Sequence, residues 1–170
     1  LDLEAVLKES CPILDICEDN GGVVWMLTPR HLAARLTDVG KTIAVADIKS
    51  PTAITQSTKT GTMLCAAGHS LYRCKAEERY LTCSTAAALD MLSDNERVIA
   101  MSLDSNDGLW LATSMGRTFC SDRHMKKFHP SPVDTLLRDG LCEDIVSTRT
   151  SVWLMNNKKV VCYNLQRKCA

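Results

Sequence analysis

Basic side chains recur at one place in this sequence, shortly after each of four short apolar segments. The segments centre on Trp25, Met63, Trp110 and Trp153, which are 38, 47 and 43 residues apart. A basic residue follows six positions after three of these centres and seven positions after the other. Clustered positive charge attracts acidic or phosphorylated partners. We therefore predict a partner-binding rim that consists of Arg30, His31, His69, Arg117, Lys158 and Lys159.

Cysteine and histidine residues form a weaker pattern that a metal could use. Cys120, His124 and His129 are separated by three and four residues, but zinc needs four ligands at a fixed geometry. The nine cysteines include no Cys-x2-Cys pair, and the chain has no Gly-x-Ser-x-Gly motif and no phosphate loop. The cysteines instead suit buried packing as small hydrophobic groups. We predict no metal, no cofactor and no catalytic residue.

Composition limits the class of protein. The chain has 170 residues, 45% of them hydrophobic, and it carries 20 basic and 20 acidic residues. A zero net charge disfavours nucleic-acid binding. No apolar run approaches the ~20 residues of a membrane span. Scattered cysteines without a glycosylation sequon favour an intracellular location. The sequence begins at Leu1, so we expect it to be part of a longer chain.

The four apolar segments belong to a repeat that must position the polar residues. Residues 6–25 align without a gap on residues 91–110, an offset of 85. Each repeat contains four short strand-like segments separated by turn residues, and the second segment is apolar at successive positions, as in a strand buried on both faces. The first repeat places its outer strands at His31–Thr37 and Lys41–Val45. A final strand is expected near Arg167–Cys169. Short helices are expected at Leu1–Glu9 and Thr85–Ser93.

A four-stranded repeat of this length is typical of a propeller blade. We predict an all-β fold, a β-propeller of four four-stranded antiparallel blades within one region, 1–170. The blades are expected at about 6–46, 47–84, 85–130 and 131–170. The four anchor side chains are expected to share a buried layer. Four blades form either a small closed ring or half of a propeller, which is an open arc with two apolar end faces. Those faces need covering by more of the parent chain, by another subunit or by a second copy.

The segment Ser102-Leu103-Asp104-x3-Gly108-Leu109-Trp110-Leu111-Ala112-Thr113-x2-Gly116 resembles the blade motif of two-component-regulator sensor propellers. It is similar, more loosely, to WD-repeat propellers. No repeat ends in a Trp-Asp dipeptide, and Gly68-His69 is the chain's one Gly-His pair. A weaker resemblance is to tandem polo boxes. It implies that His124 and Lys126 bind the phosphate of a phosphopeptide.

These patterns predict an intracellular protein-interaction scaffold, not an enzyme, that works as a subunit of a larger complex. Protein partners are expected, including acidic or phosphorylated segments, and so is self-association. One alternative is the polo-box-like phosphopeptide reader. The other is an enzyme or small-molecule sensor with a site in the axial channel. The inward polar groups available to that site are Asp15, Thr55, Ser57, Ser102 and Ser147.

Overall fold

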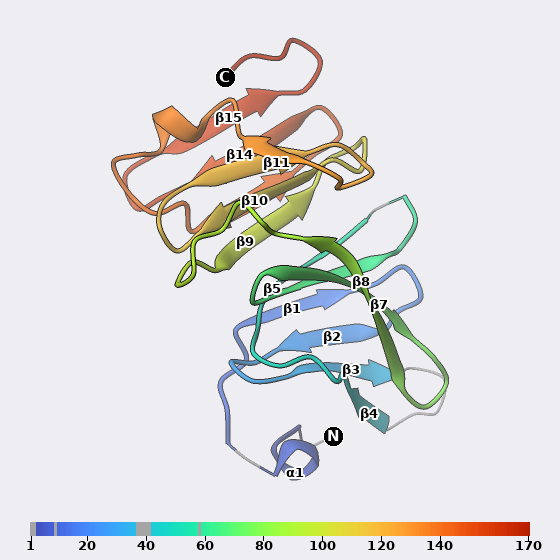
Figure 1. The fold of residues 1–170 in the computed structure, drawn as a ribbon. Coiled ribbons are helices and arrows are strands. Elements are labelled where there is room, and N and C mark those ends of the chain that lie inside the picture. The colour runs from blue at the N-terminus through green and yellow to red at the C-terminus, as the bar shows by residue number, and fades with distance from the viewer. Residues whose placement is uncertain (1–2, 9, 37–41, 58) are drawn as a thin grey trace.

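The computed structural model describes residues 3–8, 10–36, 42–57 and 59–170, which form four antiparallel sheets arranged as a four-blade β-propeller (Figure 1). The helix α1 (Leu3–Leu7) precedes the sheets, which we number as blades 1 to 4. Blade 1 contains β1 (Asp15–Glu18), β2 (Val24–Leu27), β3 (Leu32–Leu36) and β4 (Thr42–Val45). Blade 2 contains β5 (Pro51–Gln56), β6 (Met63–Ala67), β7 (Ser70–Ala76) and β8 (Leu81–Ala88).

The second half of the chain repeats this meander. Blade 3 contains β9 (Val98–Leu103), β10 (Leu109–Thr113), β11 (Thr118–Ser121) and β12 (Phe128–Pro130). The 3-10 helix η1 (Asp134–Leu136) follows, and blade 4 contains β13 (Asp144–Ser147), β14 (Ser151–Met155) and β15 (Val160–Asn164). The helix α1 and blade 4 lie at opposite ends of the molecule (Figure 1). The predicted all-β propeller of four blades is confirmed. The predicted extent of the propeller region, 1–170, stays a prediction.

The strand predicted near Arg167–Cys169 is reduced to one bridge, between Asn164 and Cys169. The Oδ1 atom of Asn164 accepts hydrogen bonds from the backbone N–H groups of Gln166, at 3.0 Å, and Arg167, at 2.8 Å. These bonds hold a tight turn directly after β15. Blade 4 therefore has three strands, where the other blades have four.

The predicted helix at Thr85–Ser93 is wrong. Strand β8 continues to Ala88, which pairs with Ser70, and Leu89 then donates its backbone N–H to the His69 carbonyl at 2.8 Å. Pairing with β7 satisfies the backbone groups that a helix would have bonded internally, so tertiary context decides against the helix-friendly composition. A helix does form at Leu3–Leu7. The predicted strand limits at Thr37 and Lys41 lie outside the described residues.

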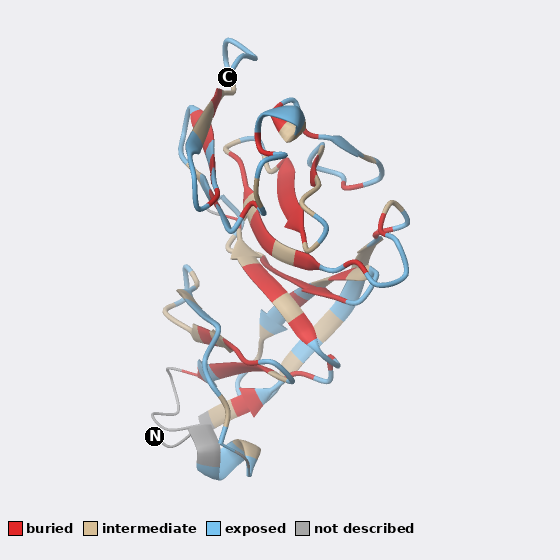
Figure 2. Ribbon diagram, turned by 90° about the vertical axis from the view of Figure 1, so that its left-hand side faces the viewer, coloured by how far each residue is buried: buried red, intermediate tan, exposed pale blue. Residues whose placement is uncertain are grey.

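Three apolar layers hold consecutive blades together. Trp25 of blade 1 packs with Met63 of blade 2, and Leu64 of blade 2 packs with Leu111 of blade 3. Trp110 of blade 3 packs with buried side chains of blade 4 and contacts the Tyr163 ring, with 5.3 Å between ring centroids. Figure 2 shows this pattern as buried segments inside the sheets and exposed turns around them. Burial of each large side chain contributes about 1.5–3 kcal/mol.

Two of the anchor tryptophans are clasped by the turn that precedes their strand. In blade 1 the Asp19 carboxylate accepts hydrogen bonds from two backbone N–H groups and from Trp25 Nε1, the last at 2.9 Å. In blade 3 Asp104 does the same and accepts from Trp110 Nε1 at 3.0 Å. A Cβ at Gly108 would lie 2.8 Å from Asp104 Oδ2 and 2.9 Å from the Ser121 carbonyl, so this turn requires glycine.

The expectation that all four anchors are buried is wrong for Trp153. Trp25, Met63 and Trp110 are at most 4% exposed, whereas Trp153 is 43% exposed. Trp153 lies on the face of blade 4 that points away from blade 3. Thr148 occupies the turn position of Asp19 and Asp104, and its hydroxyl bonds the turn backbone. The burial of an anchor therefore depends on the blade beside it as well as on its own strand.

Candidate axial site

The first strands of the four blades line a groove of about 620 Å³ on the axis of the arc. Its walls come from the starts of β1, β5, β9 and β13 and from the segments directly before three of those strands. Aliphatic side chains such as Ile54, Val98 and Met101 form much of the lining. The polar side chains of the lining are Asp15, Thr52, Arg97, Glu143 and Asp144.

Two carboxylates occupy matching positions on the two end blades. Asp15 pairs with Leu27 in blade 1, and Asp144 pairs with Met155 in blade 4. Each carboxylate accepts a hydrogen bond at 2.8 Å from the backbone N–H of the next residue, which fixes both side chains in the same way. In the middle blades, the corresponding strand positions hold Ala53 and Ala100. The groove thus has an acidic side chain at each end and small alanine side chains at the same positions in the middle.

The environment of the groove changes the acidity of Asp15. Partial desolvation raises the pKa of Asp15, the Ile16 backbone N–H lowers it, and the negative charge of Asp144 raises it further, so that the net direction is upward. A carboxyl group with a raised pKa beside a second carboxylate is a common arrangement for general acid–base chemistry. Asp15 can therefore exchange a proton closer to neutral pH than an isolated aspartate.

Arg97 and Glu143 come directly before the first strands of blades 3 and 4. The Arg97 backbone is held by Ser114, whose N–H donates to the Arg97 carbonyl at 2.9 Å and whose hydroxyl accepts from the Arg97 N–H at 3.2 Å. The backbone N–H of Glu143 donates to the Met155 carbonyl at 2.8 Å. Each residue is thus tied to its own blade where it lines the groove.

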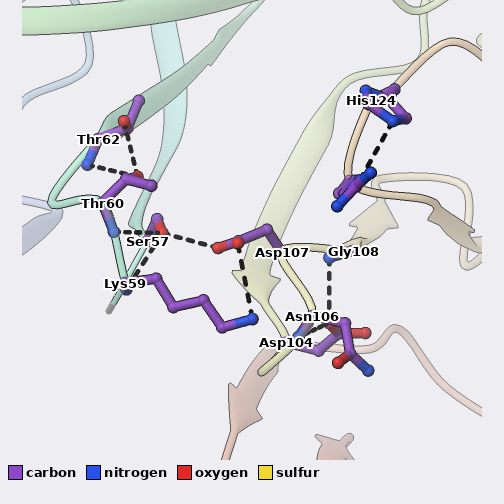
Figure 3. A network of polar contacts seen from close by, with 10 residues as sticks. Ser57, Lys59, Thr60, Thr62, Asp104, Asn106, Asp107, Gly108 and His124 are labelled. Atoms are coloured by element: carbon purple, nitrogen blue, oxygen red, sulfur yellow. Dashed lines mark hydrogen bonds and ion pairs between the residues drawn. The ribbon is translucent and has the colours of Figure 1, made fainter.

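Of the five inward polar groups expected from the sequence, Asp15 lines this groove. Ser57 instead donates a hydrogen bond to Asp107 at 2.7 Å on the opposite rim (Figure 3). Ser147 lines a different hollow, and its hydroxyl is buried without a hydrogen-bond partner among the described residues. Thr55 and Ser102 do not line the groove. The sequence reasoning missed Asp144, although it lies nine residues before Trp153 much as Asp15 lies ten residues before Trp25.

The basic residues predicted to form a binding rim lie in the turns between the second and third strands. Arg117 is paired within its own blade. Its guanidinium binds the buried carboxylate of Glu96, with Nε 2.9 Å from Oε1, and its Nη2 atom donates to the Met91 carbonyl at 2.9 Å. Hydrogen bonds from Arg117 lower the pKa of Glu96 to about 2, burial opposes them, and Thr113 adds a further hydrogen bond.

The turn of blade 4 repeats this arrangement. Lys159 Nζ lies 3.1 Å from Asp139 Oδ1, and Lys158 Nζ donates to the Asp139 carbonyl at 2.8 Å. Pairing with Lys159 lowers the pKa of Asp139. The backbone N–H of His31 donates to the Thr28 hydroxyl at 2.9 Å, Arg30 is exposed beside it, and His69 accepts a backbone bond from Leu89. Partner binding by these six basic residues stays a prediction.

The residues of the phosphopeptide alternative lie in different hollows. His124 lines a hollow of about 280 Å³ between blades 2 and 3, where its Nε2 atom accepts a hydrogen bond from Arg123 at 3.1 Å (Figure 3). Lys126 lines another depression, beside Phe128 and Asp90. Because the fold is a propeller, the six-stranded polo-box architecture that would bring this pair to one phosphate is not formed.

Cysteine side chains are partly or fully buried at the three repeated positions expected to pack. Cys74 is buried, and Cys120 and Cys162 are half-buried. The Sγ atom of Cys74 lies 3.1 Å from that of Cys83 on the neighbouring strand. Burial raises the pKa of Cys65 and Cys17 to about 12, so these thiols stay protonated. In the described part of the chain, no group of three or more His, Cys, Asp or Glu side chains could hold a metal ion.

Fold and groove together define a β-propeller arc with a polar axial site. No protein-family model matches the chain, and the search of curated proteins finds no match. Among solved structures it is similar to a gluconolactonase from Xanthomonas campestris, with a TM-score of 0.61 and 14% identity over 87% of this chain and 55% of the other. Virginiamycin B lyase from Staphylococcus aureus gives 0.58 and 13%, over 89% and 55%.

A third similar structure is the extracellular domain of a hybrid two-component system from B. thetaiotaomicron. Its TM-score is 0.68 at 11% identity, over 88% of this chain and 21% of that one. The chain thus spans about half of the two enzymes and about a fifth of the sensor. At these identities the likeness shows the fold alone. It confirms the predicted resemblance to propellers, but no WD-repeat family is matched.

Three predictions need correction. The intracellular scaffold and the expectation of a non-enzyme are wrong, because the similar propellers include named enzymes and a sensor domain. The intracellular location is not supported either, because one similar structure is an extracellular domain. No helix in the described residues is long and apolar enough to cross a membrane.

Proposed function

We propose that this chain binds a small polar molecule in the axial groove and acts on it by general acid–base chemistry. The observation that carries this proposal is the pair of carboxylates, Asp15 and Asp144, fixed at matching positions on the axial strands of the two end blades. Ligand sites are typically concave and largely apolar, with a few polar groups that converge on the ligand. The groove is concave and more polar than a typical site of this kind, with charged side chains from blades 1, 3 and 4 beside aliphatic ones.

The charges of the groove indicate what the ligand carries. Ionised carboxylates accept hydrogen bonds from hydroxyl and amino groups, and Arg97 donates to an acidic group or a carbonyl. A volume of about 620 Å³ is in the range of small-molecule sites. We therefore assign the ligand to the class of small molecules with several hydroxyl or amino groups.

Asp15 takes the acid–base role and Asp144 the positioning role in this proposal. Desolvation and the neighbouring negative charge raise the pKa of Asp15, which favours proton exchange at this carboxyl group. In its protonated form it can give a proton to a leaving group, and in its ionised form it can take one from a nucleophile. The similarity to propellers named as a gluconolactonase and a lyase supports an enzymatic outcome. The sensor domain among the similar structures supports binding alone.

A thermal-shift screen of polyhydroxylated and amino compounds tests the proposal. The expected hit stabilises the wild type and the control variant Asp94→Asn, which changes an exposed carboxylate outside the groove, but not Asp15→Asn or Asp144→Asn. If turnover of the hit is followed by NMR, Asp15→Asn should lose turnover. A hit that stabilises the groove variants as well as the wild type, or a screen without hits, would contradict the proposal.

A further inference from the structure

Each blade has a leading face, toward the next blade in the chain, and a trailing face, toward the preceding one. The strand register assigns equivalent positions on these faces. In the second strand of blade 1, Trp25 points to the leading face. The residues at the same register position are Leu64 in blade 2, Trp110 in blade 3 and Trp153 in blade 4. Trp25, Leu64 and Trp110 are buried in the layers that join their blades to the next blade.

The leading face of blade 4 has an exposed apolar patch, with Asp144 at its border opposite Met155. Trp153 lies opposite Val146, and Met155 lies opposite Val160, so the four side chains form two neighbouring pairs on one face. Their exposed fractions are 43%, 52%, 41% and 60%, in that order. A contiguous apolar face of this kind on a folded protein marks an interaction surface.

The trailing face of blade 1 is exposed at the corresponding position. Ile54, Met101 and Ile145 hold that position in blades 2, 3 and 4, and each is at most 6% exposed because the preceding blade covers it. Ile16 holds the same position in blade 1 and is 57% exposed. Val45, on the same face, is 38% exposed.

We propose that blade 4 of one chain docks on blade 1 of a second copy, leading face to trailing face. In the three interfaces within the chain, each leading face is covered by the trailing face of the next blade. That trailing face has an apolar residue at the Ile16 position. Among the described blades, blade 1 is the one whose trailing face is exposed at the Ile16 position, although Ala33 on the same face is buried. The two faces belong to blades 1 and 4, which lie apart in the molecule (Figure 1), so one chain does not cover its own.

The size of the similar propellers favours a second copy as the occupant. The chain covers 55% of the gluconolactonase and 55% of the lyase, so one arc is too short for a whole propeller of that kind and two arcs together provide more than enough chain. Head-to-tail contacts between two arcs use both faces of each chain and close into a ring. This association does not rest on the proposed function, because it is argued from the exposed apolar side chains of the two end faces.

Sedimentation velocity and light scattering test the proposal on the purified chain. We expect a mass of twice the 18.7 kDa of one chain. Trp153→Asp and Ile16→Asp should each give monomers, because each damages both interfaces of a homodimer. Tyr80→Asp, which changes an exposed side chain outside the two faces, should stay dimeric. Circular dichroism checks that each variant is folded, and Trp153→Ser and Ile16→Ser are milder replacements for any that is not.

A mixing experiment separates this geometry from other modes of association. Trp153→Asp retains an intact trailing face, and Ile16→Asp retains an intact leading face. An equimolar mixture of the two should therefore form heterodimers through one intact interface, with weaker affinity than the wild type. A wild-type monomer at all concentrations overturns the proposal. Dimers that survive both substitutions, or a mixture that stays monomeric, overturn it as well.

Discussion

The buried ion pair between Glu96 and Arg117 gives a quantitative prediction for stability. The Glu96 side chain is fully buried, and its carboxylate accepts hydrogen bonds from Arg117, Thr113 and the Ser93 backbone N–H. The pKa of Glu96 falls from its ordinary value of 4.5 to about 2. This lowering of the pKa by about 2.5 corresponds to a stabilisation of the folded state by about 3 kcal/mol when Glu96 is ionised. Because the Arg117 side chain is 40% exposed, solvent screening reduces the expected contribution to about 2 kcal/mol.

The substitution Glu96→Gln tests this contribution by urea unfolding. We expect the free energy of unfolding at pH 7 to fall by about 2 kcal/mol, because a neutral amide places a donor beside the donors of Arg117. Glu77→Gln is the matched control. Glu77 lies 3.0 Å from Lys75, whose side chain is 74% exposed, so its loss should cost less than about 0.5 kcal/mol.

The pH dependence provides an independent check. The pKa of Glu96 is lower in the folded state than in the unfolded state, so its stabilisation is fully present above about pH 5. It is lost as the pH falls from about 5 to about 2, where the carboxylate becomes protonated in both states. The difference between the wild type and Glu96→Gln should shrink over that range. An equal cost for Glu96→Gln and Glu77→Gln, or a difference that does not change with pH, would refute this reasoning.

Three further predictions concern the clasp and the groove. Asp104→Ala should lower the free energy of unfolding by about 1–3 kcal/mol, because it leaves the buried Trp110 Nε1 without a partner. Thr148→Ala at the equivalent turn of blade 4 should cost less, and chemical denaturation of the two variants compares them. Gly108→Ala should lower the melting temperature, because the added Cβ would clash with Asp104 and the Ser121 carbonyl. An unchanged melting temperature would contradict this clash. Asp144→Asn should lower the pKa of Asp15 and leave it above its ordinary value, because desolvation is the larger cause; carboxyl NMR titration measures it, and an unchanged pKa would show that the two groups do not interact.

The sequence was sufficient to predict the blades because their signals are local and repeated. The offset of 85 between the two Asp–Trp clasps reflects a turn and a strand that fold the same way twice. Turn residues and continuous apolar strands carry this information within a few positions. The helix expected at Thr85–Ser93 failed because pairing with β7, a tertiary contact, extends the strand through its first half.

The site was harder to predict because it depends on residues that meet across the arc. Asp15 and Asp144 are 129 positions apart and become neighbours only through the geometry of all four blades. Arg117 and Lys159 follow a regular spacing that indicated a rim, yet each pairs with an acidic residue from a preceding connection. Spacing predicts where a side chain lies along its strand, whereas its partner is decided by the packing of separate segments.

Chemical-shift mapping of a bound ligand tests the axial site most directly. A compound from the thermal-shift screen is titrated into the isotope-labelled chain, and the backbone amides that shift are assigned. The axial account predicts that the shifts cluster on 14–15, 52–54, 97–101 and 143–144, and that Asp144→Asn removes them. Shifts confined to the turns of Arg117 and Lys159, or to the hollow beside His124, would contradict the account.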